Sequence, residues 1–262
     1  MPHLEPGWRS AFALAVVLAL AAVLARRTRA ATALREAAGV CLLYLGWIGI
    51  GTLTHPHVEG AQERARQLYA FEQQLHLPSE LSVQHLVVPH PWLAHLVNGY
   101  YLYGHLNVIG LTLLWTWLRH REGYAALRVQ LIVLTVLGEA IQTYALAPPR
   151  LLPDLGFVDL ARSYGESVYG DYGSGVASQL LAMPSLHVGW AALVAWTVWR
   201  HAHGAWRWVG VAHLVLMTLV VVATANHWWM DGVVAVALLA VVVAATEAAK
   251  REQHEPALLV QA

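Results

Sequence analysis

Lysine and cysteine are almost absent from this sequence of 262 residues. Lys250 is the single lysine, so the other basic side chains are arginines, and Cys41 is the single cysteine. One cysteine excludes a disulfide within the chain. Basic and acidic residues number sixteen each, and this balance predicts no nucleic-acid partner.

Charged residues of either sign are also scarce. They make up 12% of the sequence, whereas 58% of the residues are hydrophobic. In an ordinary soluble domain, roughly a quarter of all residues are charged. The composition therefore excludes such a domain and predicts a protein embedded in a membrane.

Long uncharged runs locate the expected membrane spans, because a bilayer core of ~30 Å needs about 20 helical residues. We predict an all-α fold, a polytopic membrane helix bundle. The first run ends at Arg26 and is not followed by a small-residue cleavage site, which favours a retained helix over a cleaved signal peptide. The expected helices lie near 8–25, 36–54, 91–118, 127–147, 184–200, 206–225 and 227–247.

The positions of the short-loop cations predict the orientation. Basic residues lie between the first and second, the third and fourth, and the fifth and sixth expected spans, and again in the 248–262 tail. The positive-inside rule assigns these segments to the cytoplasm. The 55–90 segment, the 148–183 loop and the corner at 226 then face outward, across a plasma membrane.

The stretch 59–77 differs from the spans because apolar and charged residues alternate at helical spacing. We expect a connecting helix that lies in the membrane interface. Glu72 belongs to the expected polar side. The apolar stripe consists of Ala61, Ala65, Leu68, Phe71 and Leu75.

Four ionisable residues fall at membrane depth, where an uncompensated charge costs a few kcal/mol. Glu139 is given no chemical role. His227 and Asp231 are four residues apart and therefore share one helical face, where a carboxylate can fix the imidazole tautomer. His187 begins the expected 184–200 span, and His227 begins the expected 227–247 span. The chain crosses the membrane twice between them, so both histidines lie at the same membrane face.

Two further features of the outward side fit an anionic ligand. Pro184 is expected in the first turn of its helix, whose free N–H groups favour an anion. Arg150 lies in the outward loop, where a guanidinium can bind two phosphate oxygens. Together with the histidines, these residues indicate a phosphate site.

Each feature also has a structural explanation. His187 can be a satisfied interfacial residue, the His227–Asp231 pair can neutralise itself, and Arg150 can anchor a loop. Trp228 and Trp229 are expected in the aromatic belt. The pairs His55 with His57 and His201 with His203 lack a clear third ligand, so we predict no metal and no cofactor.

Three sequence motifs resemble those of the type 2 phosphatidic acid phosphatase superfamily. They are "APPRLLPDLGFVD", "MPSLH" and, two helices later, "TANHWWMD". Within that superfamily the chain is most similar to the branch that contains inositol phosphorylceramide synthase, the aureobasidin-resistance type, and its actinobacterial relatives. The likeness covers roughly residues 60–247.

The resemblance implies a six-helix core, here preceded by one N-terminal transmembrane helix, and metal-independent phosphoryl transfer through a phosphohistidine. His227 would be the nucleophile, Asp231 its orienting carboxylate and His187 the general acid. Ser185 would help to hold the phosphate, with Arg150 as its cationic partner. General acid–base and nucleophilic catalysis by imidazole agree with this assignment.

The motifs also depart from the family pattern. Thr143 occupies the position of the usual lysine, and Leu151 follows Arg150 where proline is usual. Val220 and Val221 replace the usual serine and arginine of the third motif, and Leu186 replaces a glycine. The "PPR" form and the lost arginine are similar to the inositol branch.

The sequence therefore predicts an integral-membrane lipid phosphatase or phosphotransferase. Its expected substrate is a phospholipid or a polyisoprenoid- or sphingolipid-type phosphoester. An inactive membrane scaffold or lipid transporter of the same fold is the alternative. The expected division is N-terminal transmembrane helices over 1–58, a phosphatase-like membrane core over 59–247 and a cytoplasmic tail over 248–262.

Overall fold

The computed structural model describes residues 8–28, 30–53, 59–166 and 179–259. These residues form helices and connecting turns, with no strand among them. The principal helices are α1 (Trp8–Leu24), α2 (Ala30–Leu53), α3 (Ala61–Gln74), α4 (Glu80–His85), α5 (Pro91–Gly99), α6 (His105–Arg119), α7 (Arg121–Gln142), α8 (Leu160–Ser163), α10 (Leu186–His201), α11 (Arg207–Ala223) and α12 (Trp229–Leu259).

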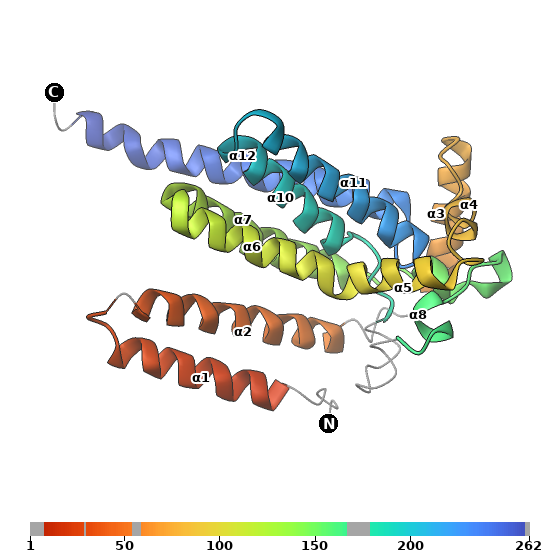
Figure 1. The fold of residues 1–262 in the computed structure, drawn as a ribbon, viewed down its shortest axis with the longest axis horizontal. Coiled ribbons are helices and arrows are strands. Elements are labelled where there is room, and N and C mark those ends of the chain that lie inside the picture. Colours follow the sequence, from red (N-terminus) through yellow and green to blue (C-terminus); the bar gives the residue numbers. More distant parts are fainter. Residues whose placement is uncertain (1–7, 29, 54–58, 167–178, 260–262) are drawn as a thin grey trace.

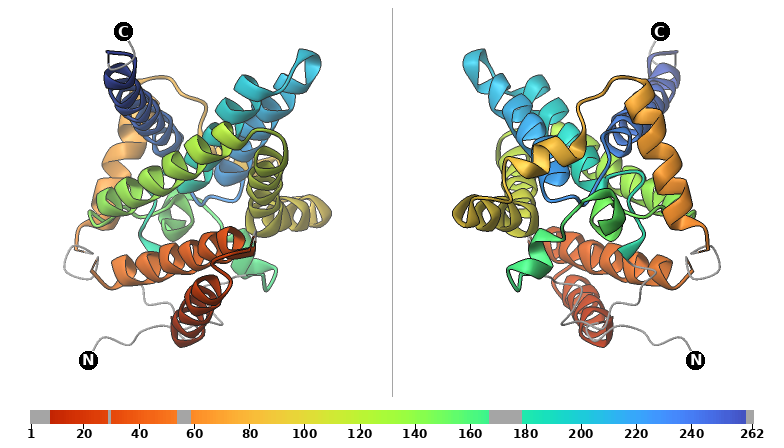
Figure 2. Two further views of the ribbon diagram at one scale, coloured as in Figure 1. Left: turned by 90° about the vertical axis from the view of Figure 1, so that its left-hand side faces the viewer. Right: turned by 90° about the vertical axis from the view of Figure 1, so that its right-hand side faces the viewer.

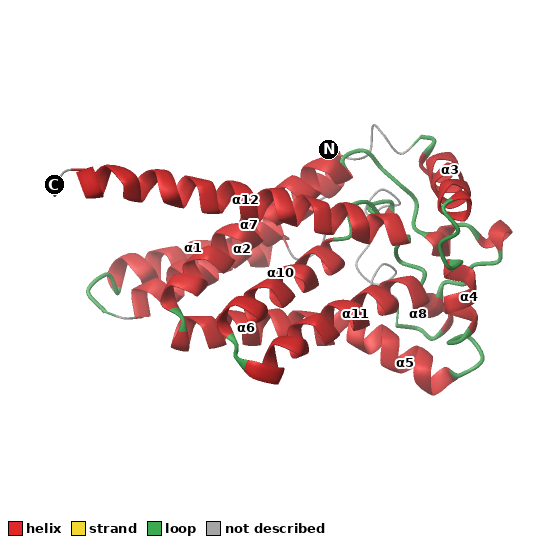
Figure 3. Cartoon of the chain, turned by 90° about the horizontal axis from the view of Figure 1, so that it is seen from above, coloured by secondary structure: helices red, strands yellow, loops and turns green. Residues whose placement is uncertain are grey.

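The long helices α6, α7, α10, α11 and α12 pack side by side in an elongated bundle (Figure 1). Helices α1 and α2 form a hairpin that lies along this bundle, with α2 next to α7. The short helices α3, α4, α5 and α8 gather at one end (Figure 3). The view along the bundle shows the same arrangement, with the α1–α2 hairpin beside the other helices (Figure 2).

The bundle has the surface of a membrane protein. Three helical stretches in the described part of the chain are long and apolar enough to cross a bilayer, namely Arg121–Gln142, Gly204–Ala223 and Trp229–Glu252. Large apolar side chains such as Leu111, Leu118 and Val241 point outward, with more than half of their surface exposed. A helix that is apolar on its outer face as well as on its inner face is typical of a membrane-spanning segment. The predicted all-α membrane bundle is confirmed.

Close packing of α10 on α11 fixes the separation of the two helices. Gly210 of α11 faces Ala195, and a Cβ added at Gly210 would lie 2.9 Å from the Ala195 Cα. Small residues at such crossings let membrane helices approach closely. This contact fixes α10, which carries His187, relative to α11, which directly precedes the segment of His227.

The two ends of the bundle differ in charge as the loop cations predict. The α1–α2, α6–α7 and α10–α11 turns, each of which has arginines in or beside it, lie at one end together with the far end of α12 (Figure 1). The short helices and the starts of α10 and α12 lie at the other end. The assignment of these ends to the two sides of the membrane stays a prediction.

Several predicted helix boundaries are wrong. Helix α10 begins at Leu186, so Pro184 precedes the helix instead of occupying its first turn. Helix α7 ends at Gln142, five residues before the expected end, because Thr143 to Ala147 turn toward the site. The expected 91–118 span is divided by a π-helical turn, Tyr100–Gly104. Helix α12 continues beyond residue 247 into the expected tail.

The expected polar face of α3 is also corrected. Of the apolar stripe, Ala61 and Ala65 are buried in the protein, whereas Phe71 and Leu75 are about half exposed. Glu72, assigned to the polar side from the sequence, is completely buried. Helical periodicity located α3 but did not reveal that Glu72 points at the start of α12.

The orientation can be tested with single cysteines in a Cys41→Ala background. Ser163→Cys on α8 and Ala205→Cys beside the α10–α11 turn place exposed thiols near opposite ends of the bundle. In intact cells an impermeant thiol reagent should label residue 163 and leave residue 205 unlabelled, because the arginine-bearing turns face the cytoplasm. Both should react after solubilisation in detergent. The reverse pattern in cells would invert the assignment.

Candidate functional site

A tight reversal between α11 and α12 presents His227. Ala225 adopts a left-handed conformation, with φ of 54°, which is unfavourable for a residue with a Cβ. The N–H groups of Asn226 and His227 then both donate to the carbonyl of Val221, at 3.0 and 3.2 Å. The reversal is therefore anchored to the last turn of α11.

The His227 ring is buried and is held through its Nδ1 atom. Nδ1 lies 2.8 Å from the carbonyl oxygen of Ala182 and 3.3 Å from Asp231 Oδ2. Both neighbours are acceptors, so the ring places its proton on Nδ1, and Nε2 keeps a lone pair. The nearer partner is a backbone carbonyl, which residue spacing could not indicate.

Asp231 has no exposed surface and connects the two histidine segments. Its Oδ2 atom also accepts the Trp228 N–H at 2.8 Å, which caps the start of α12. Its backbone carbonyl accepts the N–H of Ser185 at 3.0 Å, just before α10. The starts of α10 and α12 are therefore fixed to each other through one residue.

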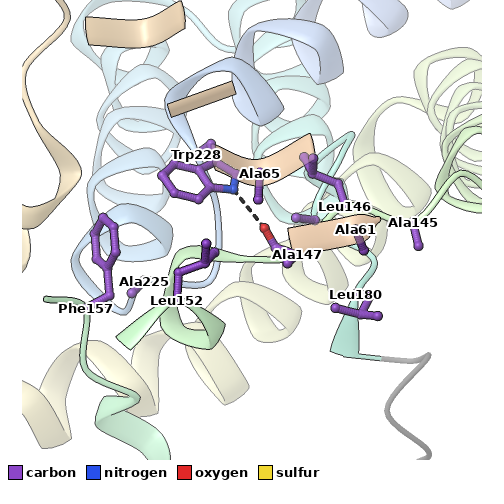
Figure 4. Close-up of a cluster of buried hydrophobic side chains, with 11 residues drawn as sticks. Ala61, Ala65, Ala145, Leu146, Ala147, Leu152, Phe157, Leu180, Ala225 and Trp228 are labelled. Atoms are coloured by element: carbon purple, nitrogen blue, oxygen red, sulfur yellow. Dashed lines mark hydrogen bonds between the residues drawn. The ribbon is translucent and has the colours of Figure 1, made fainter. Parts of the chain in front are cut away.

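Trp228 anchors the chain directly after His227. It is 1% exposed and donates from its indole nitrogen to the carbonyl of Ala147 at 2.9 Å. Ala65 of α3 and Phe157 lie in the same buried cluster (Figure 4). The expectation that Trp228 belongs to the aromatic belt is wrong, because Trp228 is packed in the protein interior.

His187 lies in the first turn of α10, next to the cap of that helix. Ser185 is the N-cap residue, and its hydroxyl accepts the Val188 N–H at 3.3 Å. Ser185 has no exposed surface and does not line the cavity beside the histidines. Ser185 is therefore hydrogen-bonded to Asp231 through its backbone, but its side chain does not line the cavity of Arg150, His187 and His227.

The two histidine rings face the same space. Their centroids are 6.0 Å apart, with 53° between the ring planes. Tyr101, from the π-helical turn before α6, stacks on His187 at 4.3 Å between centroids. This stacking fixes the plane of the His187 ring, which lines the same cavity as His227.

Arg150 reaches the site from the turn Pro149–Leu151. It is 6% exposed, and its Nε donates to Asn226 Oδ1 at 2.9 Å. Its Nη1 lies 3.4 Å from Gln179 Oε1 and 3.6 Å from Asp159 Oδ2. The Arg150 N–H donates to the carbonyl of Ala225, so backbone and side chain both tie Arg150 to the reversal before His227.

Arg150, His187 and His227 line one cavity of about 90 Å³. A single water needs about 10–15 Å³ by such a measure, so the cavity can hold a group of several heavy atoms, such as a phosphoryl group. Among the described residues that line it, Arg150 is the one with a permanent charge. The rest of the lining is amide, imidazole, phenol and apolar side chains.

The positions that depart from the family motifs have structural roles. Thr143 ends α7, and its hydroxyl donates to the carbonyl of Ala140. Val220 and Val221 are buried in the core. Leu186 lies against Gly138 of α7, where a Cβ would be 2.6 Å from Leu186 Cδ2.

Sequence reasoning missed several residues of the site. Asn226 and Gln179 orient Arg150, and Tyr101 supports His187. Asn226 could have been suspected because it directly precedes His227 at membrane depth. Gln179 and Tyr101 carry no comparable signal, since only the fold brings their segments to the cavity.

The histidine pairs that were considered for a metal are not part of this site. His55 and His57 lie outside the described residues. The His201 ring lies against His120 in a tilted arrangement at the opposite end of the bundle, with ring centroids 5.1 Å apart. No group of three or more histidine, cysteine or acidic side chains within the described ranges could hold a metal ion.

The fold and site define a helical membrane protein with two histidines, a buried carboxylate and a held arginine at one end of the bundle. A family model described as the PAP2 superfamily matches residues 66–245, more than half of the chain. The chain belongs to the PAP2 superfamily, and its function is therefore of the phosphatase or phosphotransferase type. No curated protein and no solved structure matched it.

The contacts of Arg150 predict a defect in phosphate binding for Arg150→Lys. Lysine cannot keep the Nε bond to Asn226 and donate a planar pair of N–H groups to an anion. A hydrogen bond to a charged group contributes about 1.5–3 kcal/mol, so affinity for inorganic phosphate should fall about 10- to 100-fold. Calorimetric titration of the purified protein measures it. The control is Arg162→Lys, an exposed arginine on α8; equal affinities for all three proteins would contradict the assignment.

Proposed function

We propose that the protein acts on a lipid phosphoester through a phosphohistidine at His227. The observation that supports this most directly is the pairing of His227 Nδ1 with Ala182 and Asp231, at 2.8 and 3.3 Å. A proton held on Nδ1 leaves the Nε2 lone pair as the nucleophile. The nearby carboxylate stabilises the positive charge that develops on the ring when Nε2 bonds to phosphorus.

In the first step, His227 Nε2 attacks phosphorus while the bond from phosphorus to the lipid oxygen breaks. Protonated His187 donates its proton to that leaving oxygen. Both rings line the same cavity, so one phosphoryl group bound there can contact the nucleophile and the acid. The products are a phosphohistidine, a free lipid alcohol and neutral His187.

In the second step, water or an alcohol attacks the phosphorus and the bond to Nε2 breaks. Neutral His187 takes the proton of the attacking hydroxyl, which restores both histidines. Arg150 stabilises the charge on the phosphate oxygens during both steps. We assign Ser185 an indirect part, since it caps α10 and so positions His187.

The charge of the cavity favours a phosphodiester over a phosphomonoester. Arg150 is the one permanently charged residue of the described lining, and a phosphodiester carries a single negative charge. We therefore favour transfer of a phosphate-linked headgroup to another lipid, as in an inositolphosphotransferase-like reaction. The arginine-bearing turns would face the cytoplasm and the site would face outward from the plasma membrane.

An inactive scaffold or transporter of the same fold is the alternative. Asp231 also has a structural role, but a scaffold would have no use for a buried His227 and a buried Arg150 beside His187. Burial of ionisable groups in a membrane domain is costly, and here Arg150, His187 and His227 line one cavity. This cost favours the enzyme.

Replacement of the nucleophile tests the proposal. His227→Ala should abolish turnover of every member of a lipid panel, assayed in chelator and scored for free phosphate and for transferred headgroup. The wild type should remain active in chelator and yield an acid-labile phosphorus adduct that the variant lacks. His201→Ala, at the other end of the bundle, is the control. Undiminished turnover by His227→Ala would disprove the mechanism.

The dependence on the leaving group separates His187 from Asp231. His187→Ala should lower kcat/KM for a lipid ester by about 10²- to 10⁴-fold, but much less for a p-nitrophenyl ester, whose leaving group needs no proton. Asp231→Asn should slow both substrates by similar factors, because it loosens the nucleophile itself. If His187→Ala slows both esters equally while chemistry limits the rate, His187 is not the acid.

A further inference from the structure

Two glutamates outside the membrane spans converge on the start of α12. Glu72 comes from α3 and Glu80 from the first turn of α4, and neither side chain has any exposed surface. Helices α3 and α4 lie at the same end of the bundle as the start of α12 (Figure 1). Neither residue lines the cavity described above.

The glutamates bind successive backbone groups directly after His227. Glu72 Oε1 accepts the Met230 N–H at 2.7 Å, and Glu80 Oε1 accepts the Trp229 N–H at 3.4 Å. Asp231 Oδ2 accepts the Trp228 N–H at 2.8 Å. The first N–H groups of a helix have no partner within it, and here three carboxyl groups satisfy them in sequence.

Three ionised carboxylates in this place would repel one another strongly. The Oε2 atoms of Glu72 and Glu80 are buried and have no hydrogen-bond donor among the described residues while both groups are ionised. A single proton between the two carboxyl groups would satisfy both oxygens, as in other carboxyl pairs that share a site.

The titratable groups that act on Glu72 are Glu80 from α4 and Asp231 from α12. Burial raises the pKa of Glu72 from 4.5 to about 9; the hydrogen bond to Glu80 and the charges of Glu80 and Asp231 act in the same direction, against the bond from Met230. Glu72 therefore retains its proton at neutral pH.

We propose that Glu72 and Glu80 share one proton and act as a positioning pair that holds the start of α12, and with it His227, in the reactive arrangement. The catalytic part of this inference rests on the proposed role of His227. Loss of the proton places a second negative charge beside Asp231 and weakens the hold on the Met230 N–H. The pair thereby sets an alkaline limit on kcat.

The decisive comparison is between Glu72→Gln and Glu72→Ala. Glutamine accepts the Met230 N–H with its carbonyl and donates to Glu80 with its amide, so it reproduces the one-proton pair without titrating. Glu72→Ala should lower kcat about 10- to 100-fold, in keeping with the loss of a buried hydrogen-bonded group, and change KM less. Glu72→Gln should rescue most of that loss and should retain its activity above about pH 9, where the wild type declines.

Thermal stability in detergent gives a readout that does not depend on catalysis. Folding raises the pKa of Glu72, so its stabilisation is complete below about pH 4.5 and is lost as pH rises through about 9. The unfolding midpoint of the wild type should therefore fall over this interval more steeply than that of Glu72→Gln. Glu63→Gln, an exposed change on the same helix, should behave as the wild type.

The outcomes distinguish the pair from the phosphohistidine. Equal pH dependence of stability in the wild type and Glu72→Gln would refute the shared proton. A kcat of Glu72→Gln as low as that of Glu72→Ala would also refute the shared proton. If the stability difference appears but His227→Ala remains active, the proposed function fails and the shared proton stands. If the stability difference appears while the alkaline fall in kcat is unchanged in Glu72→Gln, the positioning role is wrong.

Discussion

The arrangement of the site depends on the hydrogen bonds of Asp231. Its carboxylate accepts from Trp228 N–H and from the His227 ring, and its carbonyl accepts from Ser185 N–H. One buried residue thus fixes His227, the proposed nucleophile, together with the start of α12 and the start of α10, the helix that carries His187. A loose connection would cost much activity, because reacting groups must be held close to their productive geometry.

Backbone carbonyl groups hold the site at positions where side-chain contacts were expected. The carbonyl of Ala182 lies closer to His227 Nδ1 than the carboxylate does, and the carbonyl of Val221 receives the N–H groups of Asn226 and His227. Ala225 takes a left-handed conformation to make this reversal. Such strain persists where the surrounding structure determines it, which is common at functional sites.

Arg150, the cation of the motifs that this chain keeps, is held by several neighbours. Asn226 and Gln179 hold the guanidinium of Arg150 over a small cavity, and Asp159 lies nearby. Held in this way, an arginine loses little freedom when it binds an anion. Under the proposed function, a cavity with one such cation suits a singly charged group, so the departures from the motifs agree with a phosphodiester substrate.

The sequence by itself determined the membrane bundle, the positions of its long helices and the proximity of His227 to Asp231, because uncharged length and i,i+4 spacing are local properties. Only the tertiary structure decided that Glu72 and Trp228 are buried, that Ser185 caps a helix away from the cavity, and that Tyr101 stacks on His187. These facts depend on which distant segments meet. A helical period states which residues share a face, but it does not state what that face will contact.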